Sequence, residues 1–137
     1  MQDLKLAKRI LKEKALTLVV VKKDAIIFEA KSHGINDFLH AIEKFRKKLA
    51  GSAVADRIVG RAAALLCAYS KAASVFAVTV SEEGRKVLED WDIFCEFENS
   101  VAHILNYQKT DVCPFEKLAA SLTDPIQAYE KLKTYTP

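Results

Sequence analysis

The clearest candidate for chemistry is a cysteine that stands directly before a proline at a predicted helix start. Cys113 precedes Pro114, and Glu116 follows three residues after the cysteine. Proline suits the first helical position because its missing N–H would have no partner there. Cys113 then occupies the N-cap, where the partial positive charge of the helix end favours the thiolate over the thiol. The motif predicts an activated nucleophile, with Glu116 as an acid or base towards a substrate.

The same motif also has a purely structural interpretation. A glutamate three residues after the N-cap can reach back to the cap backbone, as in a capping box. Cysteine is a weaker cap than serine or aspartate, and this misfit favours the functional interpretation slightly. The negative charge of Glu116 would oppose thiolate formation if it faced the sulfur of Cys113.

The remaining thiols and the histidines are scattered along the chain. Cys67 lies in an apolar helical run and Cys95 in a strand-like run, so both are predicted to be buried free thiols. We expect His33 to be exposed in a loop, His40 to lie at a helix surface and His103 to lie near the Cys113 loop. Their spacing specifies no catalytic triad, and ordinary structural roles are favoured.

No metal or cofactor motif is present in the sequence. The patterns H-x-x-H, H-E-x-x-H and C-x-x-C do not occur, and four scattered glycines form no phosphate-binding loop. The residues themselves therefore predict neither a metal site nor a cofactor.

Length and composition bound the class of protein. The chain has 137 residues, of which 50% are hydrophobic, with only three prolines and four glycines. These values predict one folded domain with a single core. The longest apolar run is far too short to cross a membrane, and the first residues lack the apolar core of a signal peptide. We expect a cytoplasmic protein with no membrane partner.

The net charge of +3 conceals two unlike halves. Residues 1–61 contain 14 Lys and Arg against 7 Asp and Glu, whereas residues 62–137 contain 7 against 11. A basic half could attract an anion or a nucleic acid. No aromatic residues interleave these cations as a base-stacking surface requires. A solvated helix face is therefore favoured, and a nucleic-acid partner is not expected.

Apolar periodicity predicts alternating helices and strands. The near-continuous apolarity of residues 16–21 and 25–30 predicts a hairpin buried on both faces. The alternating strand at residues 92–98 is a candidate edge for a homodimer. Residues 101–105 fit either a strand or a helical turn. Helices are predicted over residues 3–13, 37–49, 54–69, 82–90 and 114–122 and from Pro125 onward, with a further strand over residues 73–80. This order predicts a three-layer α-β-α sandwich around a mixed sheet of about four to five strands.

Two stretches together resemble an uncharacterised family, domain of unknown function 1893, whose fold is similar to that of the cytidine deaminases. They are VGRAAAL at residues 59–65 and the segment from ILN through CPFE at residues 104–116, and the loop at residues 32–35 is similar too. The resemblance covers nearly the whole chain. It implies a cleft at the carboxyl edge of the sheet, between two helix starts. The ligand-binding residues that it implies are Gly60, Arg61, Ala62, Asn106 and Ser32.

The resemblance also bears on metal chemistry. In deaminases one helix start carries His or Cys, any residue, then Glu, and another carries Pro-Cys-x-x-Cys. The helix containing Gly60 has no such ligand at its start, and the other helix offers only Cys113 and Glu116. The resemblance therefore implies the deaminase fold without its zinc ligands. The family often has Asn-Arg where this chain has Asn106-Tyr107.

Two functions follow as hypotheses. The favoured one is a small-molecule-binding or regulatory protein whose ligand is unknown. The alternative is a metal-independent enzyme that uses Cys113 as the nucleophile on a small polar or nucleotide-like substrate, assisted by Glu116 and Asn106.

Overall fold

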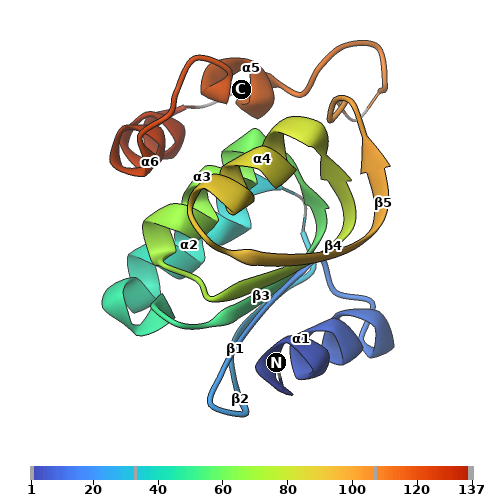
Figure 1. Ribbon diagram of the computed structural model, residues 1–137, viewed down its shortest axis with the longest axis vertical. Helices are drawn as coiled ribbons and strands as arrows, with labels where there is room; N and C mark the ends of the chain where they lie inside the picture. Colours follow the sequence, from blue (N-terminus) through green and yellow to red (C-terminus); the bar gives the residue numbers. More distant parts are fainter. Residues whose placement is uncertain (1, 33, 107, 136–137) are drawn as a thin grey trace.

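A five-stranded mixed sheet organises the molecule (Figure 1). The computed structural model describes residues 2–32, 34–106 and 108–135. The sheet order is β2-β1-β3-β4-β5, in which β1 is antiparallel to β2 and β3, and β3, β4 and β5 are parallel. The strands are β1 (Leu18–Lys22), β2 (Ala25–Ala30), β3 (Ala53–Val59), β4 (Ser74–Ser81) and β5 (Phe94–Val101). The helices are α1 (Gln2–Glu13), α2 (Ile35–Phe45), the 3₁₀ helix η1 (Arg46–Leu49), α3 (Arg61–Ser70), α4 (Glu82–Asp90), α5 (Pro114–Ala119) and α6 (Pro125–Thr134).

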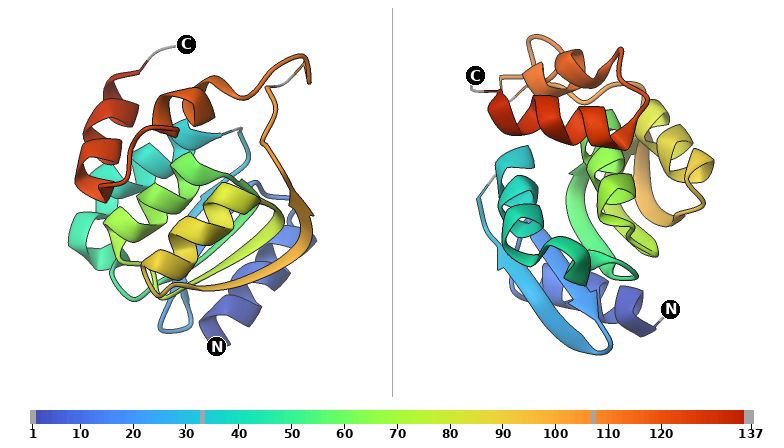
Figure 2. Two further views of the ribbon diagram at one scale, coloured as in Figure 1. Left: turned by 45° about the horizontal axis from the view of Figure 1, so that its top comes forward. Right: turned by 90° about the vertical axis from the view of Figure 1, so that its left-hand side faces the viewer.

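The predicted three-layer arrangement is confirmed. Helix α1 covers one face of the sheet, and α2, α3 and α4 cover the other (Figures 1 and 2). These three helices share a face because each connects parallel strands by a right-handed crossover in the same direction along the sheet. Each helix therefore begins at the carboxyl end of the strand before it, and the starts of α2, α3 and α4 lie along one edge of the sheet. Helices α5 and α6 lie outside this helical layer, and α6 packs on α3 through the stacked rings of Tyr69 and Tyr129, 4.3 Å apart.

The two faces of β1 enter two separate apolar clusters. Val19 and Val21 pack with α1 and with Phe76 of β4, whereas Leu18 and Val20 join the larger cluster beneath α2 and α3. Burial on both faces is therefore confirmed for β1. It is wrong for β2, whose side chains are exposed or partly buried because β2 is the edge strand.

Strand β3 is the element that sequence periodicity missed. The helix predicted over residues 54–69 is wrong, because residues 53–59 pair with both β1 and β4 and the helix begins only at Arg61. A strand flanked by neighbours on both sides is apolar all round, and a fully buried helix has the same signature. The Arg57 side chain reaches back to cap α1, donating to the carbonyls of Leu16 at 2.8 Å and Leu11 at 3.1 Å.

Several helix ends differ from the prediction by a few residues. Helix α2 begins at Ile35 with Gly34 as its N-cap, and its last predicted turn is the 3₁₀ helix η1. Helix α5 ends at Ala119 rather than near residue 122. Within residues 101–105, Val101 ends β5 and Leu105 forms an isolated bridge to Val112. None of the described helices is both long and apolar enough to span a bilayer.

The basic and acidic halves of the sequence meet across the sheet. Lys8 of α1 lies 2.6 Å from a carboxylate oxygen of Glu96, and Lys12 pairs with Glu98, both acids on β5. Part of the basic character of the first half is thus neutralised within the molecule. The Lys12–Glu98 pair is exposed and the Lys8–Glu96 pair is partly buried, and surface pairs of this kind contribute little to stability individually.

The close approach of α4 to the end of β3 yields a test of the packing. A methyl group at Gly84 would lie 2.9 Å from the backbone carbonyl of Gly60 and the carbonyl oxygen of Val59. Helix propensity alone favours alanine over glycine by about 1 kcal/mol. We nevertheless expect Gly84→Ala to lower the free energy of unfolding by roughly 1–3 kcal/mol, because backbone must move. Urea denaturation measures this. The exposed Lys86→Ala on the same helix is the control and should change stability by less than about 0.5 kcal/mol.

Candidate functional site

The start of α3 is occupied by a carboxylate from another helix. The Glu116 Oε1 atom accepts a hydrogen bond from the backbone N–H of Arg61 at 2.7 Å, and Oε2 accepts one from Ala62 at 2.8 Å. The first N–H groups of a helix lack internal partners and attract negative charge. Glu116 therefore caps α3. The structural interpretation, a capping box within α5, is wrong, since the backbone N–H of Cys113 donates to the Ile104 carbonyl at 2.9 Å.

Arg61 returns the contact to α5. Its Nε donates to the carbonyl of Ala119 at 2.9 Å, and its Nη2 donates to the carbonyl of Leu122 at 2.5 Å. Ala119 is the last residue of α5, where a helix leaves acceptors unpaired, and Leu122 lies in the connection that follows. Arg61 thus caps the end of α5 while Glu116, on α5, caps the start of α3. The start of α3 and the end of α5 are thus linked by hydrogen bonds in both directions.

Gly60 makes room for this arrangement. It is the N-cap of α3, and a methyl group there would lie 2.0 Å from Glu116 Oε1. In the structure Glu116 fills the space, so Gly60, Arg61 and Ala62 lie together with it. Whether they also bind a ligand remains a prediction.

Burial raises the pKa of Glu116 above its ordinary value. The N–H groups of Ala62 and Arg61 oppose the shift by stabilising the carboxylate, and the negative charge of Glu83 on α4 adds to it. The carboxyl is therefore held at the α3 start by hydrogen bonds that compensate for its loss of hydration.

A second carboxyl at this edge was missed by sequence reasoning. Asp56 lies in β3, partly buried on the side of α2 and α3, opposite Leu18 of β1 and Ala77 of β4. Burial raises its pKa to about 7, the backbone N–H groups of Ile58 and Arg57 oppose this, and Asp37 at the start of α2 adds to the shift. The available signal was an acid inside an apolar run. In a helix such an acid would lie on an exposed face, so the interpretation of this run as a helix hid the buried position of Asp56.

The other predicted site residues are placed at different points of the same edge. Cys113 is the N-cap of α5, partly buried, and its side chain makes no capping hydrogen bond. Asn106 closes a turn: its Oδ1 accepts from the backbone N–H of Thr110 at 2.9 Å. The Ser32 hydroxyl donates to the Asp37 carboxylate at 2.7 Å, at the start of α2.

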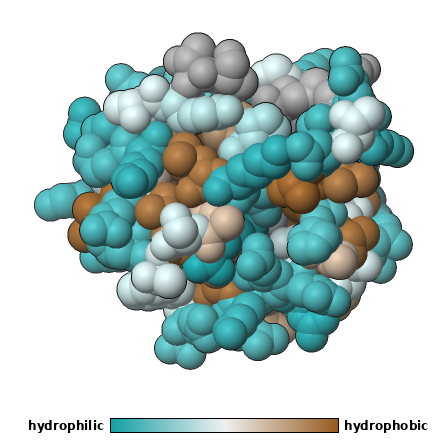
Figure 3. All heavy atoms as spheres, turned by 90° about the horizontal axis from the view of Figure 1, so that it is seen from above, coloured by the Kyte–Doolittle hydropathy of each residue, from teal (hydrophilic) through white to brown (hydrophobic). Residues whose placement is uncertain are grey.

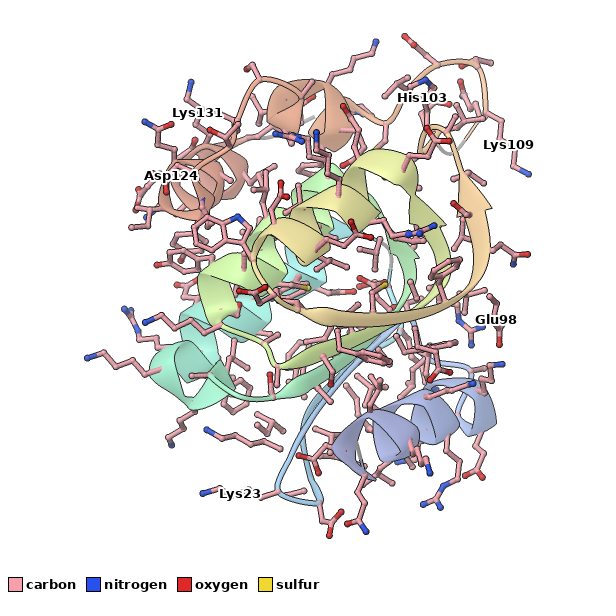
Figure 4. The ribbon with its side chains drawn as sticks, viewed as in Figure 1. Lys23, Glu98, His103, Lys109, Asp124 and Lys131 are labelled. Carbon is pink, nitrogen blue, oxygen red and sulfur yellow. The ribbon has the colours of Figure 1, made fainter. Side chains whose placement is uncertain are left out.

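The remaining thiols and histidines lie apart from this arrangement. Cys67 is fully buried, and burial raises the pKa of its thiol well above the ordinary value. Cys95 is only partly buried, and burial raises its pKa to about 11. His40 is exposed on α2, and His103 is exposed on the loop after β5 (Figure 4). His33 lies outside the described residues.

The surface above α5 and α6 shows apolar areas interspersed with polar ones (Figure 3). Leu105 and Ile126 contribute exposed apolar side chains on this side of the molecule. Two hollows of the described surface, of about 320 and 440 Å³, lie elsewhere, at the start of α1 and the amino edge of the sheet. Neither is lined by a residue of the α3 or α5 start. Glu116 fills the position at which the cleft between those helices was expected.

The donor groups at this edge do not fit the zinc of deaminases. Within residues 2–32, 34–106 and 108–135, no three His, Cys, Asp or Glu side chains are grouped to hold a metal ion. At the start of α3, Arg61 and Ala62 are not metal ligands, and their N–H groups bind Glu116. Cys113 supplies a single thiol, whereas the deaminase site uses several His and Cys ligands.

Comparisons with known proteins agree with this fold. Residues 6–136 match the family described as a domain of unknown function, DUF1893. The chain belongs to this family. A crystal structure of a DUF1893 family protein from Thermotoga maritima has a TM-score of 0.89 and 26% identity, covering 97% of this chain and 89% of that one. No protein with a curated description matches the sequence.

Two further solved structures match the chain at lower similarity. RibD from Acinetobacter baumannii has a TM-score of 0.50 and 19% identity, over 97% of this chain and 38% of that chain. The dCMP deaminase of the cyanophage S-TIM5 has a TM-score of 0.49 and 14% identity, over 73% of this chain and 94% of that one. The likeness to RibD bears on the fold alone, and this DUF1893 chain has a deaminase-like α/β fold, as the resemblance implied.

The cap formed by Glu116 can be tested directly. Glu116→Ala leaves the N–H groups of Arg61 and Ala62 without their acceptor. We expect the free energy of unfolding to fall by about 1–2 kcal/mol and the exchange of these two amide hydrogens to accelerate. Lys117→Ala is the control, because it removes only the exposed pair with Asp111. Unchanged protection of the two amides in Glu116→Ala would contradict the capping role.

The raised pKa of Asp56 predicts a pH dependence of stability. A carboxyl whose pKa is higher in the folded than in the unfolded state stabilises the protein below about pH 4 and loses this contribution as the pH rises through about 7. We expect the free energy of unfolding of Asp56→Asn to equal that of the wild type near pH 4. At pH 8 it should be larger by roughly 2–4 kcal/mol. Denaturation across this range measures the difference. The exposed Asp24→Asn variant should show no such growth with pH.

Proposed function

We propose that this protein binds a small polar molecule at the carboxyl edge of the sheet, between the starts of α2 and α3. The observation that carries the proposal is Asp56, a partly buried carboxyl whose pKa is raised to about 7. Ionisable groups perturbed in this way are concentrated at functional sites. Here the group lies on the strand that leads directly into α3.

The surroundings of Asp56 indicate the chemistry of the ligand. Ser32 and Asp37 at the start of α2 add a hydroxyl and a second carboxyl to this side of the edge. A carboxylate accepts hydrogen bonds from N–H groups, and its protonated form both donates and accepts. These groups match a ligand that presents N–H donors on a planar frame, such as a nucleobase, a nucleoside or a small amide.

The proposed role is binding or regulation without the metal chemistry of deaminases. The N–H groups at the start of α3 are satisfied within the chain by Glu116. The alternative of a Cys113 enzyme has less support, because both oxygens of the Glu116 carboxylate, its proposed assistant, are hydrogen-bonded to α3.

A ligand screen tests the proposal. Thermal unfolding of the wild type is measured with bases, nucleosides, nucleotides and small amides at pH 6 and pH 8, and chromatography follows each compound. We expect a compound with N–H donors to raise the melting temperature without being converted. Asp56→Asn should bind that compound at least about tenfold more weakly, because the acceptor is altered.

The matched control is Asp24→Asn, which changes an exposed aspartate far from this edge and should bind like the wild type. Equal binding by Asp56→Asn would contradict the assignment of the site. Stoichiometric zinc in the purified protein, together with deamination of a base or nucleoside, would contradict the metal-free role.

A further inference from the structure

The amino edge of the sheet, opposite the site above, is divided into two halves of unlike charge. This edge is formed by the β1–β2 turn, η1, and the ends of α3 and α4 that precede β4 and β5. The basic half consists of Lys22, Lys23, Arg46, Lys47, Lys48 and Lys71. The Nζ of Lys22 donates to the carbonyl of Lys48 at 3.2 Å, which joins the end of β1 to η1.

The cations of the basic half project into solvent. All except the partly buried Lys22 are exposed, and among the described residues none of these six side chains forms an ion pair with an acid, whereas Lys8 and Lys12 of α1 pair with β5. Lys23 extends from the β1–β2 turn, and nitrogen-ended side chains spread from η1 on the same side (Figure 4). Two acids lie at this turn: Asp24, and Asp3 of α1, whose carboxylate accepts hydrogen bonds from the backbone N–H groups of Lys23 and Asp24 at 2.9 Å. Against the six cations, the half keeps an excess of positive charge.

The acidic half lies at the other end of the same edge. Asp90 and Asp92 flank Trp91, where α4 ends and the chain turns into β5. All three are exposed, and the exposed fractions of Trp91 and of Phe94, the first residue of β5, are 50% and 49%. Two large aromatic side chains thus stand in solvent beside two carboxylates.

The middle of the edge is made of small residues. Gly51 and Ala73 are exposed there, and together with Ala53 and Ser74 they line part of the 320 Å³ hollow. A surface of this shape allows another backbone to come close.

We propose that two copies of this chain associate through their amino edges, about a two-fold axis that places the basic half of each on the acidic half of the other. A two-fold interface is self-complementary by construction. With a strand spacing of about 4.8 Å, the β1 and β5 ends of the edge lie about 14 Å apart, on either side of the small residues. Rotation about an axis between β3 and β4 exchanges the two halves.

In this arrangement the charged and aromatic side chains of one edge contact complementary side chains of the other. The carboxylates of Asp90 and Asp92 meet lysines, and the rings of Trp91 and Phe94 meet the same cations, which are attracted to aromatic faces. A single-stranded nucleic acid fits less well. Its phosphates would be repelled by the acids beside the rings on which its bases would stack.

Trp91 provides the measurement, because it is the only tryptophan in the chain. We expect its fluorescence maximum to shift to shorter wavelength as protein concentration rises. Sedimentation should show a mass twice the 15.3 kDa of the chain, and added salt should weaken the association. A protein that remains monomeric up to millimolar concentration overturns the proposal.

Charge reversal locates the interface. Lys47→Glu with Lys48→Glu, and separately Asp90→Lys with Asp92→Lys, should each weaken self-association at least about tenfold, because like charges then face each other. A mixture of the two double variants should associate again, since the acids introduced on one edge then face the lysines introduced on the other. The control is Lys131→Glu on α6, which should associate like the wild type.

Three results contradict the proposal: self-association that neither reversal changes, failure of the mixed variants to associate, or binding of a single-stranded oligonucleotide without self-association.

Discussion

The mutual capping of α3 and α5 is the contact on which the outer part of the structure depends. Glu116 accepts from the first N–H groups of α3, and Arg61 donates to the last carbonyl of α5 and to that of Leu122 in the connection that follows. Helix α5 has six residues, too few to be stable in isolation. Its position is therefore set by these charged hydrogen bonds and by burial of its apolar side chains. A side chain at Gly84 would collide with the backbone of Val59 and Gly60, and one at Gly60 would displace the Glu116 carboxylate from the start of α3.

The one-directional winding of the sheet determines where function can reside. Since α2, α3 and α4 all cross on one face, their starts gather at a single edge together with Asp56 and Glu116. Both carboxyls have raised pKa values because each loses hydration there. They differ in how they are held. Glu116 is bound to a helix start within the chain, whereas Asp56 receives backbone hydrogen bonds near the start of α2. This difference is why the proposed ligand contacts Asp56.

The two edges of the sheet carry different chemistry. At the carboxyl edge, partly buried carboxyls lie among helix starts, as expected for recognition of a small polar molecule. At the amino edge, cations, acids and aromatic side chains are exposed and separated along the strands. Such a surface is suited to a large partner, and its two halves complement each other. The fold shared with RibD and the DUF1893 protein of Thermotoga maritima describes the scaffold, and these residues give it its properties.

The sequence by itself determined the fold class, the hairpin and most helices, because apolar periodicity and turn residues are local signals. It could not separate β3 from α3, since a strand flanked on both sides and a buried helix are equally apolar. Only the tertiary structure decided that Glu116 caps α3, a contact between residues more than fifty positions apart. It likewise decided that Asp56 joins this edge, and that the lysines of the first half share an edge with Trp91. Such pairings depend on strand order, which no local pattern encodes.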